Sequence, residues 1–364
     1  MPASRRKFLG ICGGFGISGL PPLVRPLEAL VSQPGVAKGI GDLIGRTPMI
    51  EIGKLASGLP ARVIAKLEML NPMSVKDRPA KYMVTALQKS GKLHADTQIV
   101  EASSGNTAIA VAQLSSHLGF KTKFFMSEAV SLERRVILNA YGAEIVLTPA
   151  REHTRGARER AIDYCQRTPR AIFLNQHDNE ANPLAHYETT GPEIWRTLGK
   201  DVAAVVVGLG TCGCFSGISR YLKQKDAGIK FIGFEPKSSP VYSGGPQGEH
   251  HISGIGPGFV APNFLRARGQ LDDLVLITDE DAFEWTRRIA LAEGLLVGLT
   301  SGAAAKVACD VARRPEFKGG TIVCLFYDTG ERYLSVKGLF SMDAEGPQPK
   351  NADAKMNRNG GRSS

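Results

Sequence analysis

Several features that would place this 364-residue chain in other classes of protein are missing from its sequence. Past the first few dozen positions there is no run of about eighteen or more apolar residues, which excludes a membrane-spanning body. Its six cysteines form neither a C-x-x-C pair nor a Cys/His cluster with zinc spacing, so we expect no metal site. Despite a formal net charge of +10, no basic stripe is interleaved with aromatic residues, so nucleic acid is not an expected partner.

The composition that is present is typical of a folded globular protein. Hydrophobic residues make up 43% of the chain and charged residues 22%, a balance unlike that of disordered segments. Glycine is plentiful, with 41 residues, which indicates many backbone positions that need unusual dihedral angles or a close approach to a ligand. These properties favour an enzyme-like α/β protein, but they name no reaction.

The two ends of the chain differ from its body. Residues 4–10, SRRKFLG, resemble a twin-arginine export motif, and a mildly apolar run at 11–20 ends at two prolines. We therefore interpret 1–40 as an export signal and linker, with the periplasm as the expected location. The alternative is a basic N-terminal tail on a cytoplasmic protein. Residues 341–364 are rich in Gly, Asn, Lys and Pro, and we predict that they form a disordered tail.

Between these ends, short β-rich segments alternate with segments of helical periodicity. Several predicted strands are continuous Val, Ile and Ala runs, as expected for parallel strands covered on both faces. The alternation predicts an α/β fold with two open, twisted, mostly parallel sheets flanked by helices. Asp279 is placed to cap one helix, and Gly142 follows another. The predicted strands are 63–67, 98–102, 123–126, 144–147, 172–174, 203–207, 230–235, 274–277 and 321–325, and the predicted helices are 79–90, 107–118, 132–141, 154–167, 188–198, 216–226, 280–293 and 302–313.

Four loops follow a predicted strand or open a predicted helix, where free backbone N–H groups can face an anion. The loop SSGNT at 103–107 suits a carboxylate, although ordinary serine capping of a helix would look the same. The Gly-rich loop GLGTCGC at 208–214 suits a phosphate, but it matches neither the G-x-x-x-x-G-K-[ST] nor the G-x-G-x-x-G pattern of nucleotide sites. The other two loops are GLTSG at 298–302 and YDTGER at 327–332.

Lys76 lies in the segment NPMSVKDRP at 71–79, after a strand and just before a helix with a proline near its first turn. A lysine amine held in a partly buried cleft can lose its proton and form a Schiff base. A solvated surface lysine is the other interpretation. Because two loops with anion-binding sequences occur in the same chain, we favour the interpretation of Lys76 as a Schiff-base lysine.

With these motifs in this order, the sequence resembles the pyridoxal-phosphate enzymes of the cysteine synthase and cystathionine β-synthase family over residues 41–340. The segments GDLIGRTP at 41–48 and GERYLS at 330–335 match the family as well. The resemblance implies a type II fold, like the tryptophan synthase β-subunit, with pyridoxal 5'-phosphate bound between two domains. The implied domains are a larger cofactor-binding domain of residues 41–80 and 182–340 and a smaller, mobile substrate domain of residues 81–181.

The resemblance also implies which residues hold the cofactor. Lys76 looks like the lysine that forms the internal aldimine and later shuttles the α-proton, and Asn106 looks like the asparagine that bonds the ring hydroxyl. Thr300 takes the place of the hydroxyl residue facing the pyridine nitrogen, where a neutral group favours elimination and replacement at Cβ. The residues that match the phosphate loop are Gly210, Thr211, Cys212, Gly213 and Cys214.

For the substrate, the resemblance implies a loop that lines the substrate side and follows domain closure. This loop is SGIGPGF at 253–259, in which Gly254 lies. The family resemblance further implies a homodimer. The residues expected to hold the substrate carboxylate are Ser103, Ser104 and Thr107, with Gln176 as the second anchor.

The implied reaction is β-replacement, in which cysteine is made from O-acetylserine and sulfide through an aminoacrylate intermediate. The alternative is a cysteine desulfhydrase or another β-eliminating or β-replacing enzyme of the family, and a distant alternative is a non-catalytic binding protein with this fold. Twin-arginine export moves folded proteins, which suits a chain that takes up its cofactor first, and no membrane partner is expected afterwards. Export would weaken the biosynthetic interpretation, because activated serine is made in the cytoplasm.

The sequence departs from the family pattern at four places. The segment before Lys76 is one residue shorter than usual. Cys212 and Cys214 replace a glycine and a threonine of the phosphate loop, either as a redox-sensitive pair or as small residues tolerated in a tight turn. His177 stands where an aromatic residue is usual, and Ser253 where a glutamine is common. These changes bear on the preferred substrate more than on the chemistry.

Overall fold

The computed structural model describes residues 36–103 and 105–340. The predicted export motif, the predicted tail at 341–364 and Ser104 lie outside the described residues, and what we predict for them stays a prediction. Both sheets belong to one compact unit that begins at Gly39.

The larger sheet has six strands, in the order β1 (Met49–Glu51), β2 (Arg62–Leu67), β10 (Thr321–Phe326), β7 (Val202–Gly208), β8 (Lys230–Pro236) and β9 (Asp273–Ile277). Neighbouring strands run parallel, except that β1 pairs antiparallel with β2 at one edge. The central strands β7 and β10 are apolar except for Thr321 and are almost wholly buried, because helices cover both faces of the sheet.

The smaller sheet has four parallel strands, in the order β5 (Glu144–Thr148), β4 (Lys121–Ser127), β3 (Gln98–Ala102) and β6 (Ala171–Phe173). Consecutive residues of a strand pack into different hydrophobic clusters. Ile99 and Phe124 belong to one cluster, whereas Val100 and Phe125 belong to the other. This period of two shows that both faces of the sheet are covered.

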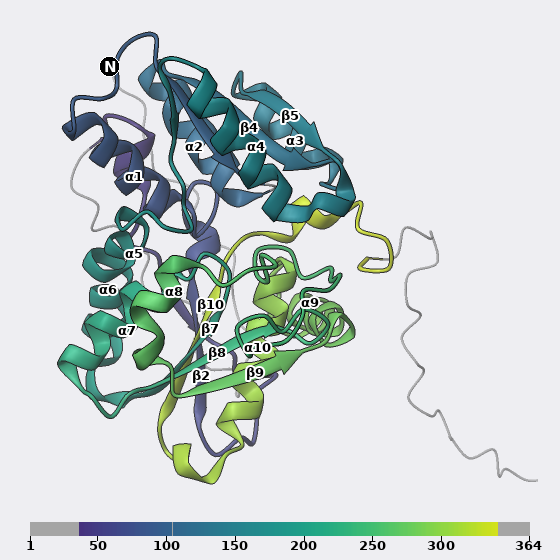
Figure 1. Ribbon diagram of the computed structural model, residues 1–364. Coiled ribbons are helices and arrows are strands. Elements are labelled where there is room, and N and C mark those ends of the chain that lie inside the picture. Colours follow the sequence, from purple (N-terminus) through teal and green to yellow (C-terminus); the bar gives the residue numbers. More distant parts are fainter. Residues whose placement is uncertain (1–35, 104, 341–364) are drawn as a thin grey trace, which may run out of the picture. The chain divides into compact units, whose positions relative to one another are not determined.

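Helices flank both sheets (Figure 1). Around the smaller sheet, α2 (Asn106–Leu118) and α3 (Leu132–Ala140) pack on one face and α4 (His153–Arg167) on the other. Around the larger sheet, α7 (Gly213–Lys225) lies on one side, and α9 (Asp279–Glu293) and α10 (Leu299–Ala312) lie on the other. The remaining helices are α1 (Asp77–Lys89), α5 (Ala181–Ala185), α6 (Gly191–Leu198) and α8 (Pro262–Ala267).

The predicted fold class is confirmed, and each predicted strand coincides with an observed one to within two residues. Several details differed from the prediction. The edge strand β1 and the short helix α8 were not predicted, because neither is long enough to show a period. The helix predicted at 188–198 consists of the end of a π-helical turn (His186–Thr190) followed by α6, and α5, which precedes this turn, was not predicted. Thr278, not Asp279, caps α9, because its side chain accepts a hydrogen bond from the Asp281 N–H.

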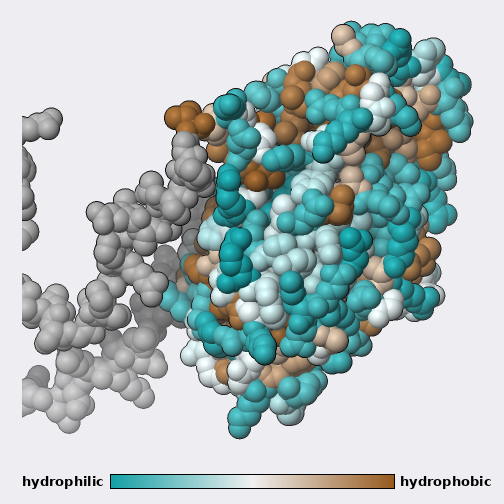
Figure 2. Space-filling model, turned by 90° about the vertical axis from the view of Figure 1, so that its left-hand side faces the viewer, coloured by the Kyte–Doolittle hydropathy of each residue, from teal (hydrophilic) through white to brown (hydrophobic). Residues whose placement is uncertain are grey.

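No helix in the described part of the chain is long and apolar enough to cross a membrane. Figure 2 shows one face of the molecule, on which hydrophilic residues predominate and hydrophobic residues gather in separate groups. The loops with predicted anion-binding sequences lie together around one cavity. They follow β3, β7 and β10, and parallel strands bring the loops at their carboxyl ends to the same edge of a sheet.

Candidate active site

A cavity of about 740 Å³ lies at the carboxyl ends of strands from both sheets. The loops after β3, β7 and β10 line it, together with the residue that precedes α1. Ligands of open α/β sheets bind at such edges. Every sequence-predicted site residue that the structure describes lines this cavity: Lys76, Ser103, Asn106, Thr107, Gln176, Gly210, Thr211, Cys212, Gly213, Cys214, Gly254 and Thr300.

Lys76 reaches the cavity from the position just before α1. The shortened segment ahead of it is held by the buried carboxylate of Asp77, which accepts hydrogen bonds from the N–H of Met73 at 2.7 Å and of Ser74 at 3.3 Å. Burial raises the pKa of Asp77 to about 7, although both N–H groups act to lower it. The loss of one residue from this segment therefore leaves a well-bonded turn that still directs Lys76 into the cavity.

The Gly-rich loop between β7 and α7 has the backbone geometry of a phosphate site. A Cβ atom at Gly210 would lie 2.5 Å from a carbonyl oxygen of the facing loop, and one at Gly213 would lie 1.8 Å from Asn182 Oδ1, so both positions require glycine. Cys212 adopts a left-handed conformation with φ of 60°, which turns the chain into α7. Among the described residues, none accepts a hydrogen bond from the N–H of Thr211 or Cys212. These donors and the positive N-terminal end of α7 can together bind an anion.

Cys212 and Cys214 are buried free thiols in this loop. Burial raises the pKa of Cys212 to about 12 and that of Cys214 to about 11. Both thiols are therefore protonated at neutral pH, which is the form that reacts slowly with oxidants. Their environment favours two small residues tolerated in a tight turn over a redox-sensitive pair.

The predicted carboxylate loop at the end of β3 is tied to Gln176. The Thr107 hydroxyl donates to Gln176 Oε1 at 2.5 Å, and Gln176 Nε2 donates to Ala102 O at 3.3 Å. Ser103, Thr107 and Gln176 are all less than a tenth exposed, yet they line the cavity. The Ser103 hydroxyl, the Gln176 amide and the backbone at the start of α2 therefore lie at one place in the cavity, a set of groups that suits binding of a carboxylate.

Asn106 is oriented by three residues of the segment at 327–335. Its Nδ2 donates to Asp328 Oδ2 at 2.7 Å, and its Oδ1 accepts from Arg332 Nη1 at 2.9 Å. The Tyr333 hydroxyl donates to the same Asp328 oxygen at 2.6 Å. The sequence singled out this segment as a loop of interest, but it did not indicate that the segment positions Asn106.

Arg134 is a buried cavity residue that sequence reasoning missed. Its Nη1 donates to Ser253 Oγ at 2.9 Å, so a side chain of α3 reaches the loop at 253–259. The Thr300 hydroxyl donates to the backbone carbonyl of Ser253 at 2.6 Å. The only sequence signal for this contact was Ser253, which stands where the family commonly has glutamine.

Two histidines near the cavity are buried. The ring of His177 lies 5.0 Å from that of Phe259, centroid to centroid. His186 lies between Thr190 Oγ1, at 2.9 Å from its Nδ1, and Cys214 Sγ, at 3.3 Å from its Nε2. Burial lowers the pKa of each imidazole to about 3, so both are neutral at physiological pH.

Replacing His186 by asparagine is expected to change how stability depends on pH. The unfolded imidazole binds a proton near pH 6.5, whereas the folded one stays neutral down to about pH 3, so wild-type stability falls as the pH drops through this window. Between about pH 6.5 and about pH 5 the loss amounts to about 2 kcal/mol. Urea unfolding at several pH values should show this loss in the wild type and a smaller one in His186→Asn.

The matched control for this comparison is His94→Asn, which removes an exposed imidazole and should keep the wild-type pH dependence. If His186→Asn and the wild type lost the same free energy of unfolding between neutral pH and pH 5, the imidazole of His186 would not be held neutral.

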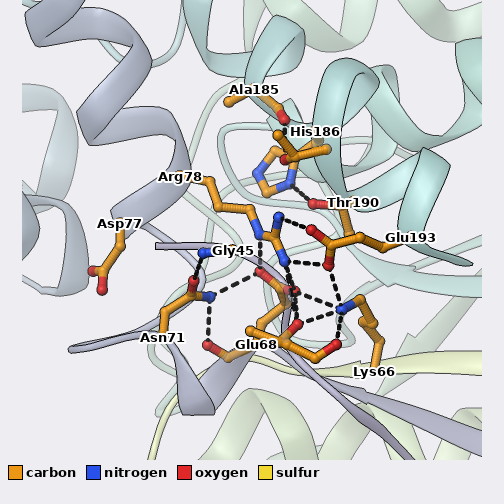
Figure 3. Close-up of polar contacts among 12 residues, drawn as sticks. Gly45, Lys66, Glu68, Asn71, Asp77, Arg78, Ala185, His186, Thr190 and Glu193 are labelled. Carbon is orange, nitrogen blue, oxygen red and sulfur yellow. Dashed lines mark hydrogen bonds and ion pairs between the residues drawn. The ribbon is translucent and has the colours of Figure 1, made fainter. Parts of the chain in front are cut away.

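A buried cluster of four charged residues anchors the start of α1 (Figure 3). Arg78 donates to both oxygens of Glu68, at 2.7 and 2.8 Å, and to both oxygens of Glu193, at 2.8 and 2.7 Å. Lys66 Nζ lies 2.7 Å from the Glu193 carboxylate. Burial alone would raise the pKa of Glu68, but Arg78 and Lys66 lower it to about 2. Because Arg78 follows Lys76 by two residues, this cluster fixes the helix that begins directly after Lys76.

Comparison with known proteins identifies the family. The model of the pyridoxal-phosphate dependent enzyme family matches residues 40–328. Cysteine synthase 3 of Caenorhabditis elegans is 40% identical over 309 residues, which are 84% of this chain and 91% of the relative. The solved structure of the O-acetylserine dependent cystathionine β-synthase from Helicobacter pylori has a TM-score of 0.79 and 38% identity, covering 84% of this chain and 100% of that one. The hydrogen sulfide-producing enzyme of Fusobacterium nucleatum has a TM-score of 0.79 and 37% identity, covering 82% and 100%.

The chain therefore belongs to the family of pyridoxal-phosphate dependent enzymes, and the predicted family, fold and cofactor are confirmed. The cavity fits this cofactor. It offers the amine of Lys76 for a Schiff base, unpaired N–H groups and two obligatory glycines for a phosphate, and the side chains of Asn106 and Thr300 for a ring. The role of each single residue stays a prediction that the arrangement supports.

Proposed function

We propose that the protein catalyses β-replacement, in which O-acetylserine and sulfide give cysteine and acetate. One observation carries this proposal: the reactive lysine, the carboxylate loop and the phosphate loop all line one cavity. The comparisons add support, since one relative is named a cysteine synthase and one structural neighbour is named as O-acetylserine dependent.

Each group of residues has a task in this reaction. The bound cofactor supplies an electron sink for charge that develops at the substrate Cα. Ser103, Thr107 and Gln176 bind the substrate α-carboxylate, which orients the Cα–H bond toward Lys76. Lys76 Nζ removes the Cα proton before acetate leaves and returns a proton after sulfide has added at Cβ.

The test uses the purified, cofactor-loaded protein. Given O-acetylserine and sulfide, it is expected to form cysteine, measured by chromatography of the amino acid. The second candidate is a cysteine desulfhydrase, which the hydrogen sulfide-producing neighbour favours. Release of sulfide, pyruvate and ammonia from cysteine, without cysteine formation, would establish that activity instead. Neither reaction in the loaded protein would indicate a non-catalytic binding protein and contradict the proposal.

We also propose that the chain is exported by the twin-arginine route and acts as a homodimer. The motif at 4–10 supports export, and the resemblance to the family supports the dimer. The location of the full chain in cells, with and without the paired arginines, tests the first. The mass of the purified protein in solution tests the second.

A further inference from the structure

Gln176 is held in the cavity wall by hydrogen bonds to both its side chain and its backbone. Its side chain contacts Thr107 and Ala102, as described above, and its N–H donates to Glu101 Oε2 at 3.0 Å. Its carbonyl oxygen accepts two further hydrogen bonds, from side chains of elements that lie later in the chain. Every nitrogen and oxygen atom of Gln176 thus makes a hydrogen bond, with the second Nε2 hydrogen left for a ligand, so its position follows that of its partners.

The two donors to this carbonyl are the amides of Asn182 and Asn263. Asn182 lies in α5 and is 2% exposed, and Asn263 lies in α8 and is fully buried. Asn182 Nδ2 donates to Gln176 O at 2.8 Å, and Asn263 Nδ2 donates to the same oxygen at 3.1 Å. Neither side chain lines the cavity, so neither contacts a bound ligand directly.

Both amides also bond the phosphate loop, and at the same residue. Asn182 Nδ2 donates to Thr211 Oγ1 at 3.0 Å, and Asn263 Nδ2 donates to Thr211 O at 3.2 Å. Because Thr211 Oγ1 accepts from Asn182, its own hydroxyl hydrogen stays available to a ligand in the cavity. Asn182 Oδ1 packs so closely on Gly213 that a Cβ there would lie 1.8 Å away, so no other residue fits between the asparagine and the loop.

We propose that Asn182 and Asn263 are positioning residues that join the two ligand-holding parts of the site into one unit. One part is the phosphate loop at Thr211, and the other is the carboxylate anchor at Gln176. Two buried amides from different helices make the same bridge, and we call this pair of asparagines the clamp. The clamp sets the distance between the cofactor phosphate and the substrate carboxylate. The assignment of the carboxylate to Gln176 rests on the proposed function, whereas the contacts of the clamp do not.

The clamp predicts that removing one amide weakens two affinities in parallel. Loss of a buried hydrogen bond of this kind changes an equilibrium by about five- to tenfold. We therefore expect Asn182→Ala and Asn263→Ala each to raise the Kd of pyridoxal phosphate for the apoprotein about five- to tenfold, measured by fluorescence titration. We expect a similar rise in the Kd of L-serine for the holoenzyme, measured by the shift of its visible band. The KM of O-acetylserine should rise, while kcat changes by less than about twofold, because Lys76 is untouched.

Asn179→Ala is the matched control. Its amide lies in the same segment and donates to a backbone carbonyl, Leu174 O, at 2.8 Å, but it does not contact the phosphate loop. This variant should keep the wild-type affinity for pyridoxal phosphate. Thermal unfolding of the three variants identifies a general loss of stability, and if Asn182→Ala does not fold, Asn263→Ala tests the same bridge from the other helix.

Several outcomes would overturn the clamp: a change in only one of the two affinities, an equal change in Asn179→Ala, or no saturable binding of L-serine by the wild type. The proposed function fails separately. The wild type could make no cysteine from O-acetylserine and sulfide while both affinities still weakened together in the clamp variants. That result would support the clamp and contradict the proposed reaction.

Discussion

Replacing Lys76 by alanine is expected to lower the rate of cysteine formation by about a thousandfold, in line with the loss of a general acid–base group. The variant should still bind pyridoxal phosphate through the Gly-rich loop, but without the visible absorption band of a lysine-linked cofactor. Lys76 is half-buried at the cavity wall, and no other lysine lines that cavity among the described residues. The rate is measured as cysteine formed per enzyme, and the band by absorbance of the loaded protein.

Lys81→Ala is the control for this loss. Lys81 lies on the same helix, α1, and its Nζ donates to Gly41 O at 2.9 Å, away from the cavity. This variant should keep both the rate and the absorption band. A Lys76→Ala protein that retained more than about a tenth of the wild-type rate would show that another group moves the proton, and the proposed role of Lys76 would be wrong.

The second large effect concerns stability. Arg78→Met is expected to lower the free energy of unfolding by about 3–5 kcal/mol, because it leaves the carboxylates of Glu68 and Glu193 buried without their main partner. Glu68 is fully buried, so its charge has no access to water. Lys66 alone cannot balance two carboxylates. Urea unfolding of the apoprotein near pH 7 measures the loss, which keeps cofactor binding out of the comparison.

The control is Arg62→Met, which breaks an ion pair with Glu51 whose side chains are both about half exposed. Exposed pairs contribute about 0–1 kcal/mol, so this variant should unfold close to the wild type. A loss of less than about 1 kcal/mol in Arg78→Met would mean that the buried carboxylates take up protons or water at little cost, and the cluster would not be an anchor of α1.

The sequence predicted which residues line the cavity better than it predicted the short elements of the fold around them. Lys76 and the described site residues of the loops after β3 and β7 line the cavity, as the sequence predicted, because each signal is local: a strand, then a short loop, then a helix. The same local logic failed where the signal was short. The three residues of β1 and the six of α8 show no period, and the π-helical turn at His186–Thr190 overlaps the start of a helix that was predicted as regular from residue 188.

The sequence by itself determined the family, the cofactor, the two-sheet architecture and a set of residues that line the cavity, because these depend on motifs of fewer than about ten residues and on periodicity within single elements. Only the tertiary structure decided which groups hold those residues in place. Asn263 bonds Gln176 from 87 positions away, and Arg332 bonds Asn106 from 226 positions away. Partners so distant leave no mark in local sequence, since nothing but the packing of the two sheets brings them within hydrogen-bonding distance.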